Sequence, residues 1–538
     1  MQNPSVIVIG GYSPDTLLKL STACLGVGRN IMATLEGLND TLTDEMSLLP
    51  HHELKATLAD LAGIYAEVEE VIPHLRITDR RSAATMRIGR LLQSLHTRLE
   101  KDLREVRSVV SICNNMGDNS GERGRMAEIV REIITESIGV LGGLGDSITH
   151  TLVAATPAVT MPSVLENESP PARQQSNVRR DIYNIRAAKL RPDQPDDDII
   201  VRPSISPLVA GRNIASVSRG RLEDSDLFLP TTQDLDSPFI IESKAVDLSN
   251  TSLVDLKREV QNLKKMLSII DPEEWGILRM RQIHFRETDQ CFDLIYDLPP
   301  KCGRPRTLRN ILLDEHNKRG SIHSLSDRFK LARRLANAVL KVHNAGMVHK
   351  NIRPDTIVIC EDSDADKYNR YPRKLGTPYL AGFENARKDG PWSRRIGDGS
   401  WEKDIYLHPQ RQGLCPSHTY SLLHDIYSLG VVLLEIAYWQ SFVLQNARCN
   451  TDLLRIFPTS GGRLTAVEIR DQLVRKATMV VPRAMGDKFS AVVLSCLNCL
   501  DGAFGKLNEL DEDINDDGDV IGILYIEKVV EALDQISL

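Results

Sequence analysis

Apolar residues in the first 153 positions recur at the three- and four-residue spacing of amphipathic helices. Shorter stretches of this kind cover 16–38, 53–72 and 126–153, and the longest starts at Ile88. Its stripe consists of Ile88, Leu92, Leu95, Leu99, Leu103, Val106, Val110 and Cys113. Because a helix with one apolar stripe must bury that stripe, we expect an all-α helical bundle over residues 1–153.

The pattern changes over residues 154–238. Proline and serine recur in TPAVTMPSV, ESPPARQQS and RPSISPL, and few apolar residues are periodic. Such a segment can bury little surface to offset its chain entropy, so we expect a flexible linker. Its basic stretch, 173–191, suits anionic lipid or an acidic partner, although a solvated linker alone explains the composition.

Globular patterning returns after residue 238. Residues 239–241 and 291–298 are strand-like, whereas 253–267 and 326–344 carry single helical stripes. The stretch DIYSLGVVLLEIAYW is apolar on nearly every face, which is typical of a helix inside a large domain. The sequence therefore predicts an α+β domain that follows the bundle and the linker.

Composition narrows the class of protein. Of the 538 residues, 41% are hydrophobic and 26% are charged, which is ordinary for globular chains. The net charge of -7 argues against a nucleic-acid binder. Nine cysteines without framework spacing suit a reducing compartment, and neither a signal peptide nor an apolar run of transmembrane length is present. We expect a cytoplasmic protein.

Ordered segments after residue 238 resemble those of the protein kinase family. They are IIESK, the helix that begins at Ser252, FDLIYDLPP, VHKNIRPDTIVI, YLAGFENAR, YLHPQR and HDIYSLGVVLLEI. The resemblance implies an α+β bilobal protein-kinase-like fold, with an N-lobe over 239–300 and a C-lobe over 301–538. The whole chain is then multidomain, with the helical bundle first.

The resemblance also assigns residue roles. Lys244 would be the phosphate-binding lysine, and Glu259 its ion-pair partner. Four structural motif residues follow, with Asp425 bracing the catalytic loop and His349 packing on the metal-binding turn. They are His349, Phe383, Asp425 and Gly430.

The positions that carry chemistry in that family are changed. Asn351 stands at the catalytic acid, and Thr356 and Gly382 stand at the two metal ligands. Phosphoryl transfer needs a carboxylate near the substrate hydroxyl and oxygen ligands for magnesium. We therefore predict a catalytically inactive pseudokinase that is not an enzyme, with no catalytic residue. Glu384 could reach a metal, but Thr356 leaves the second ligand weak, and a weak or atypical ATP-dependent kinase is the alternative.

Retained residues still permit a ligand. Lys244, Glu259 and Arg353 would allow ATP to bind without a metal, and the alternative is that Lys244 and Glu259 simply pair with each other. No metal site is predicted. Cys496 and Cys499 have no second pair, and the acidic loop from Asp513 has a leucine where a calcium loop needs glutamate.

The order of bundle, linker and kinase-like part resembles fungal kinase-like proteins with an N-terminal HeLo-type helical domain. The carrying segments are VVLSCLNCL and IGILYIEKVVEALDQISL, and the likeness to mixed lineage kinase domain-like proteins is distant and architectural. It implies a signalling switch in fungal cell death or heterokaryon incompatibility, in which the C-terminal part receives a signal and controls the bundle. A protein partner or upstream receptor, homo-oligomerisation through the bundle and conditional recruitment to the plasma membrane would follow. The alternative is a protein–protein scaffold without membrane activity.

Overall fold

The computed structural model divides the chain into two compact units, Met1–Ala172 and Arg173–Leu538. In the first unit it describes residues 14–39, 51–71, 83–115 and 120–155. In the second it describes 181–182, 184–185, 208–209, 212–213, 219–223, 225–230, 238–246, 253–314, 323–366, 368–388, 400–413, 416, 418–454, 456, 464–503 and 517–536.

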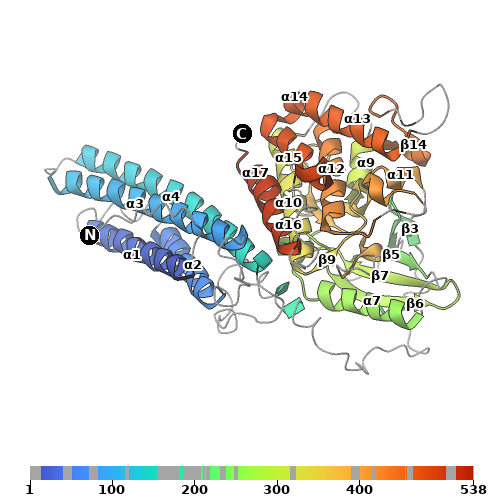
Figure 1. The fold of residues 1–538 in the computed structure, drawn as a ribbon, viewed down its shortest axis with the longest axis horizontal. Helices are drawn as coiled ribbons and strands as arrows, with labels where there is room; N and C mark the ends of the chain where they lie inside the picture. Colours follow the sequence, from blue (N-terminus) through green and yellow to red (C-terminus); the bar gives the residue numbers. More distant parts are fainter. Residues whose placement is uncertain are drawn as a thin grey trace. The chain divides into compact units, whose positions relative to one another are not determined.

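Four long helices make up the described part of the first unit, as the stripes predict. They are α1 (Pro14–Asn39), α2 (His51–Val71), α3 (Ala83–Asn115) and α4 (Ser120–Ala155), and Figure 1 shows α3 and α4 side by side. The α3 stripe from Ile88 to Val106 is buried against its neighbours. At the far end Val109 is buried, and nothing is described for the side chains of Val110 and Cys113. The helical prediction for the N-terminal part is confirmed.

The second unit contains a five-stranded antiparallel sheet. Its strands are β3 (Arg219–Arg221), β4 (Leu227–Pro230), β5 (Phe239–Ala245), β7 (Cys291–Asp297) and β6 (Met280–Arg286), paired in that spatial order. Ile241 on β5 lies opposite Ile295 on β7 in the apolar centre of the sheet. Helix α7 (Leu253–Leu267) packs beside β6 (Figure 1).

Helices form the rest of the second unit. α12 (Leu422–Tyr438) is buried at every position from Leu422 to Ala437, as its uniform apolarity predicts. It packs between α10 (Leu325–Asn344) and α15 (Asp487–Leu497). The other longer elements are α9 (Leu308–Leu313), α13 (Ala466–Met479), α14 (Val481–Met485), α16 (Asp517–Tyr525), a π-helix (Ile526–Val530) and α17 (Glu531–Asp534).

Short elements connect these layers. The strands β8 (Arg306–Thr307), β10 (Ile357–Cys360) and β11 (Thr377–Leu380) form a three-stranded antiparallel sheet in the order β11-β10-β8. The pairs β1 (Leu208–Val209) with β2 (Arg212–Asn213), β9 (Met347–Val348) with β12 (Arg387–Lys388), and β13 (Val443–Leu444) with β14 (Arg448–Cys449) are also antiparallel. Single-turn helices are α8 (Pro272–Trp275) and α11 (Trp401–Asp404).

The predicted linker, 154–238, is too long. β3 and β4 lie inside it and extend the sheet. The sequence does not reveal them, because strands of three and four residues are too short to show an alternating pattern. Ile182 and Ile185 are buried in the second unit, and the indole N–H of Trp275 donates to the carboxylate of Asp181 at 3.3 Å. The basic stretch 173–191 therefore includes packed residues, although most of it lies outside the described residues.

Cysteine usage also differs from expectation. The scattered cysteines are expected to suit a reducing compartment, but Cys302 and Cys360 form a disulfide between the chain after β7 and the end of β10. Fifty-eight residues separate them along the chain, so no local spacing marks the pair. Within the described residues, the helices are all too short or too polar to cross a membrane.

Candidate functional site

Three segments meet at the predicted chemical positions. They are β5, the loop of residues 349–356 before β10, and the turn of residues 381–386 after β11. Antiparallel pairing of Ile357 with Leu380 places the start of β10 beside the end of β11. The amide of Ala381 then donates to the carbonyl oxygen of Thr356 at 2.8 Å, which joins the loop to the turn.

Asp425, at the start of α12, holds the loop. Its carboxylate accepts the backbone amides of His349 at 2.7 Å and Lys350 at 2.9 Å. The hydroxyl of Tyr420 donates to it at 2.8 Å, and the His343 ring nitrogen lies 3.2 Å away. Lys350 has a φ of 67°, a left-handed conformation uncommon for residues with a Cβ, and the bond to Asp425 holds its amide there. The bracing role that the resemblance implies is thus visible as hydrogen bonds.

Asn351 connects the loop to the turn through its amide group. Its Oδ1 accepts from the guanidinium Nε of Arg353 at 2.8 Å, and its Nδ2 lies 3.4 Å from Oε1 of Glu384. Asn351 and Arg353 are buried, and Glu384 is half-buried. The site therefore places one carboxylate next to the neutral amide of Asn351, to which the resemblance assigns the position of the catalytic acid.

Thr356 and Gly382 are packed against each other. The Thr356 hydroxyl lies 2.7 Å from the carbonyl oxygen of Asn351 and 2.9 Å from that of Arg353, and it accepts the amide of Arg353 at 3.2 Å. A Cβ built on Gly382 would lie 2.5 Å from the methyl carbon of Thr356, and the φ of Gly382 is 83°. Thr356 thus closes the loop and fills the space that a side chain at 382 would need.

Two side chains from β5 reach the turn. The buried carboxylate of Glu242 accepts the amides of Phe383 at 3.1 Å and Glu384 at 3.0 Å, and the hydroxyl of Tyr296 at 2.9 Å. The ammonium of Lys244 donates to the carbonyl oxygen of Glu384. Both side chains point to the same face because they are two residues apart on a strand.

The pKa values of both carboxyl groups are raised, and the charge of Glu384 contributes to the shift at Glu242. Burial is the main cause that raises the pKa of Glu242, and the charge of Glu384 raises it further, while the three hydrogen bonds act in the opposite direction. Burial also raises the pKa of Glu384, although Arg353, Lys403 and Lys244 oppose that shift. Because Glu384 is less buried and faces three cations, it is the carboxylate of this pair that holds the charge.

His349 and Phe383 form a buried contact under the turn. Their ring centroids are 4.4 Å apart at an edge-to-face angle of 62°. The Nδ1 of His349 accepts the amide of Asn351 at 3.2 Å, and burial lowers the pKa of His349 to about 4. A neutral, buried histidine packs the loop on the turn and does not serve as a proton donor near neutral pH.

The remaining predicted residues lie apart from this site. Glu259 is exposed on α7, and the Lys244 ammonium lies against the turn at Glu384. The prediction of a Lys244–Glu259 ion pair therefore finds no support in these contacts. Gly430 lies where α12 meets α15, because a Cβ there would come within 2.6 Å of the Cβ of Cys496.

Sequence reasoning missed Glu242, a buried acid of the site. The available signal was its position two residues before Lys244 in the run FIIESK, since a strand places alternate residues on one face. An acid among apolar strand residues needs donors, and here two of them come from a turn 141 and 142 residues further along the chain. That long-range pairing could not be derived from local pattern.

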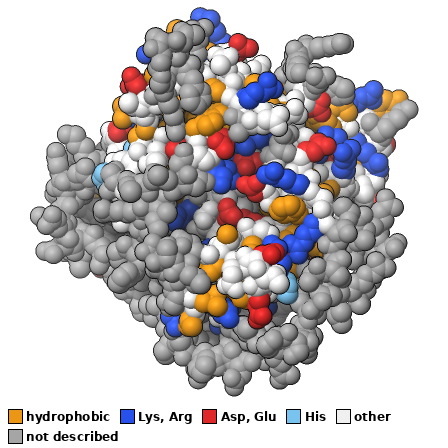
Figure 2. All heavy atoms as spheres, turned by 90° about the vertical axis from the view of Figure 1, so that its right-hand side faces the viewer, with side chains coloured by type: hydrophobic (Ala, Val, Ile, Leu, Met, Phe, Trp, Pro, Cys, Tyr) orange, Lys and Arg blue, Asp and Glu red, His pale blue; other side chains and the backbone are white. Residues whose placement is uncertain are grey.

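The described side chains of the site suit an anion, or a cation held by one carboxylate, better than a metal ion enclosed by several ligands. No group of three or more His, Cys, Asp or Glu side chains comes together as a metal cage in the described part of the chain. Lys244, Arg353 and Lys403 supply positive charge near Glu384. Figure 2 shows acidic and basic side chains gathered around a hollow in the face of the second unit that carries β3 and β14. Cys496 and Cys499, which have the spacing of half a metal site, are buried. The Cys499 thiol donates to the carbonyl oxygen of Leu423.

Comparison with known proteins finds a partial likeness to kinases. No protein-family model matches the chain. It is 29% identical over 115 residues to Eukaryotic translation initiation factor 2-alpha kinase 1 from Rattus norvegicus, covering 20% of this chain and 17% of that protein. It is 27% identical over 131 residues to eIF-2-alpha kinase GCN2 from Mus musculus, covering 22% of this chain and 8% of that protein. The match therefore spans less than a fifth of each relative.

These relatives contradict one prediction. The changes at Asn351, Thr356 and Gly382 predicted that the chain is not an enzyme, yet both relatives are named kinases. That prediction is wrong on this comparison. Its physical weakness is that it weighed Glu384 only as a metal ligand, whereas the structure places the Glu384 carboxylate beside the amide of Asn351.

Proposed function

We propose that the unit Arg173–Leu538 has a kinase-like bilobal fold and works as a nucleotide-binding signalling domain. Its five-stranded sheet with α7 would be the smaller lobe, and the helices around α12 the larger one. Lys244 on β5 and Arg353 in the loop supply the cations that phosphate groups need, and both lower the pKa of Glu384. The observation that carries the proposal is this convergence of β5, loop and turn.

The nucleotide would bind through its phosphates at Lys244. That ammonium donates to the carbonyl oxygen of Glu384, and a phosphate oxygen could replace this acceptor without moving the strand. Glu384 would hold a divalent cation by one carboxylate, since Glu242 already accepts three hydrogen bonds and Thr356 is engaged by the loop. A single carboxylate favours a weakly held cation.

A thermal unfolding series on the full chain tests nucleotide binding. ATP, with and without magnesium, should raise the melting temperature of the wild type, because a ligand that binds only the folded state stabilises it. Lys244→Ala should abolish this shift, whereas Lys264→Ala, which removes an exposed lysine from α7, should keep it. Equal shifts in both variants, or none in the wild type, would remove the proposal.

A second candidate function is phosphoryl transfer by an atypical ATP-dependent kinase. It is favoured by the 3.4 Å approach of the Glu384 carboxylate to Asn351 and by the names of the two relatives. Glu384 would then orient the cation on the nucleotide phosphates, which is the largest contribution in reactions of this type. Transfer of labelled phosphate to a protein acceptor should be lost in Glu384→Gln and kept in Glu287→Gln, an exposed control in the β6–β7 turn.

The described helices of the first unit supply the part that such a domain would control. They form a separate compact unit with striped, buried faces, so nucleotide binding could change whether these faces stay packed. The finer resemblance, to fungal kinase-like proteins with a HeLo-type helical domain, belongs to this same proposal, with a protein partner upstream. Chemical cross-linking and vesicle leakage by the full chain, with and without ATP, test it. ATP-independent behaviour in both assays would separate the helical unit from the switch.

A further inference from the structure

The disulfide between Cys302 and Cys360 joins the segment that leaves β7 to the end of β10. The two Cα atoms are 5.2 Å apart, which lies within the usual range for a disulfide. Cys360 is only 5% exposed, whereas Cys302 is half-buried. Cys302 is therefore the end of the bond that a reagent from solvent reaches first.

Backbone hydrogen bonds hold the two segments together independently of the sulfur–sulfur bond. The amide of Gly303 donates to the carbonyl oxygen of Glu361 at 2.8 Å, and the amide of Ser363 donates to that of Lys301 at 2.8 Å. Neither bond needs the disulfide, so the two cysteines stay neighbours when it opens. Two groups held side by side react at a high effective concentration. The pair is thus suited to repeated opening and closing.

The disulfide also closes a covalent ring, 302–360, around part of the candidate site. Fifty-eight residues separate the two cysteines, and the ring contains α9, α10, β9 and the loop of residues 349–356. Asn351, Arg353 and Thr356 therefore lie inside it. Because a cross-link restricts the unfolded chain, opening the ring makes unfolding of the segments inside it easier. One bond thus controls the stability of the loop.

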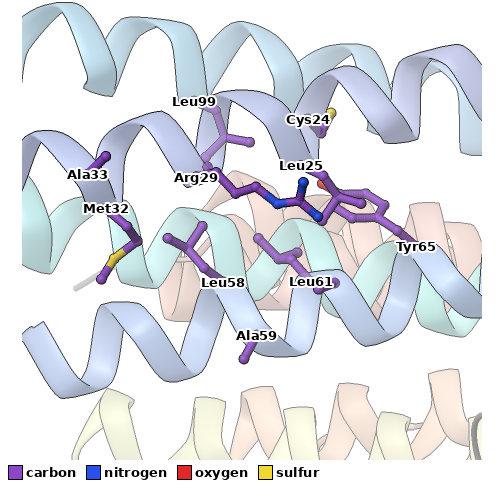
Figure 3. A pocket seen from close by; sticks show the side chains of 12 residues that line it. Cys24, Leu25, Arg29, Met32, Ala33, Leu58, Ala59, Leu61, Tyr65 and Leu99 are labelled. Atoms are coloured by element: carbon purple, nitrogen blue, oxygen red, sulfur yellow. The ribbon is translucent and has the colours of Figure 1, made fainter.

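The other described cysteines are protected by burial. In the first unit Cys24 is 1% exposed, and it lines a cavity between α1 and α2 together with Tyr65 (Figure 3). The Cys24 thiol forms a hydrogen bond with the Tyr65 hydroxyl, and burial raises its pKa to about 11. Burial likewise raises the pKa of the thiols of Cys291, Cys449, Cys496 and Cys499. Since the thiolate is the reactive form, these thiols exchange slowly near neutral pH.

We propose that Cys302 is the entry point of a thiol–disulfide switch operated by glutathione. A glutathione thiolate attacks the Sγ of Cys302, a sulfur–sulfur bond forms there, and the bond to Cys360 breaks. The Sγ of Cys360 leaves with the electron pair and takes a proton from water.

A second glutathione thiolate completes the opening. It attacks the sulfur of the bound glutathione and releases glutathione disulfide and the Cys302 thiolate, which takes a proton in turn. Two electrons pass from two glutathione molecules to the protein disulfide, and glutathione disulfide closes the bond by the reverse steps. The switch acts on the stability of the ring and does not depend on nucleotide binding.

Equilibration of the full chain in glutathione buffers tests the proposal. Alkylation and mass spectrometry should show that the disulfide fraction falls as glutathione replaces glutathione disulfide and returns when the ratio is reversed. Hydrogen exchange should be roughly tenfold or more slower in α10 and the loop 349–356 of the oxidised protein than in the reduced protein. Helix α3, which belongs to the other compact unit, should exchange equally in both states.

Three variants separate the roles of the cysteines. Cys302→Ser should remove the redox dependence of hydrogen exchange in the ring. Cys449→Ser, which removes a half-buried thiol outside the ring, should keep that dependence. In Cys360→Ser, glutathione disulfide should modify Cys302 roughly tenfold or more faster than it modifies Cys360 in Cys302→Ser, because Cys302 is the more exposed of the two.

Each of these measurements can fail in a recognisable way. A disulfide that persists in excess glutathione, or thiols that stay free in excess glutathione disulfide, would overturn the switch. Equal hydrogen exchange in the ring of the oxidised and reduced wild type would do the same, and this comparison needs no variant to fold. Modification of Cys360 as fast as that of Cys302 would overturn the assignment of the entry point.

Discussion

Two buried carboxylates in the second unit accept nearly the same hydrogen bonds, yet their pKa values shift in opposite directions. Asp425 and Glu242 each accept two backbone amides and one tyrosine hydroxyl. Burial raises the pKa of both, but the neighbouring His343 and His349 and the loop amides hold the pKa of Asp425 below its usual range. Glu242 faces Glu384 instead, and its pKa rises. Two backbone amides and a hydroxyl do not by themselves fix the charge of a buried acid; the additional neighbours, the histidines beside Asp425 and Glu384 beside Glu242, decide it.

The largest expected effect is the loss of the Asp425 charge. Asp425→Asn places an amide NH₂ against backbone N–H donors and should lower the free energy of unfolding by about 3–5 kcal/mol. Urea unfolding followed by circular dichroism measures it. The exposed Asp471→Asn on α13 should change stability by less than about 0.5 kcal/mol. A mild effect at 425 would mean that the loop does not depend on this charge.

The turn beside Glu242 should be intolerant of any side chain. Gly382→Ala should destabilise by about 2–4 kcal/mol, because the new Cβ meets Thr356 in addition to the left-handed backbone strain. Gly413→Ala is the matched control, since Gly413 also has a positive φ but no heavy atom of the described residues within 4 Å of its added Cβ. It should cost only the strain, about 1 kcal/mol. Equal effects on the unfolding free energy would contradict the packing argument.

A pair of hydroxyl deletions compares the two acids directly. Tyr420→Phe removes a donor to charged Asp425 and should cost about 1.5–3 kcal/mol. Tyr296→Phe removes a donor to Glu242 and should cost about 0.5–1.5 kcal/mol where that carboxyl is protonated. Urea unfolding near pH 6 gives both values. The reverse order would show that Glu242 is the charged member.

The pH dependence of stability should have opposite signs at the two sites. The folded state holds a proton on Glu242 that the unfolded state releases above its ordinary value of 4.5, so this contribution is complete below that pH and is lost as pH rises. Asp425 behaves in reverse: its contribution is present above its ordinary value of 3.8 and is lost as pH falls. Each slope is at most about 1.4 kcal/mol per pH unit for one proton.

Glu384→Gln isolates the contribution of Glu242 in a pH series of urea unfolding curves. Removing the like charge lowers the pKa of Glu242 and narrows the range over which stability falls with rising pH. The loss of stability at low pH, which belongs to Asp425, should occur at the same pH as in the wild type. If the fall in stability at higher pH is also unchanged, Glu384 has no influence on Glu242.

The predictable parts of the molecule are those governed by local pattern. The α3 stripe and the uniformly apolar α12 follow from residue spacing, because burial of a helix face leaves a periodic signal. The short strands β3 and β4 were missed because three or four residues carry no period. Ile182 and Ile185 lie in the basic stretch 173–191 of the predicted linker, where composition hides two buried side chains.

Long-range polar contacts were harder to foresee. The kinase resemblance placed Asp425, His349 and Phe383 together, and the structure shows their contacts. It paired Lys244 with Glu259, whereas Lys244 contacts the turn and Glu259 is exposed. The sequence did not predict the contact between Glu242 and Glu384. The hydrogen bond from the Glu384 amide to the Glu242 carboxylate spans 142 residues and depends on how two sheets meet.

The interlocked pair Thr356 and Gly382 also restricts how this chain could change over generations. A mutation that introduces an acid at 382 first would meet the Thr356 methyl at once. A mutation that shrinks residue 356 first would open the loop by removing the hydroxyl that caps it. Either order passes through a less stable intermediate, so the two positions are expected to evolve as a unit.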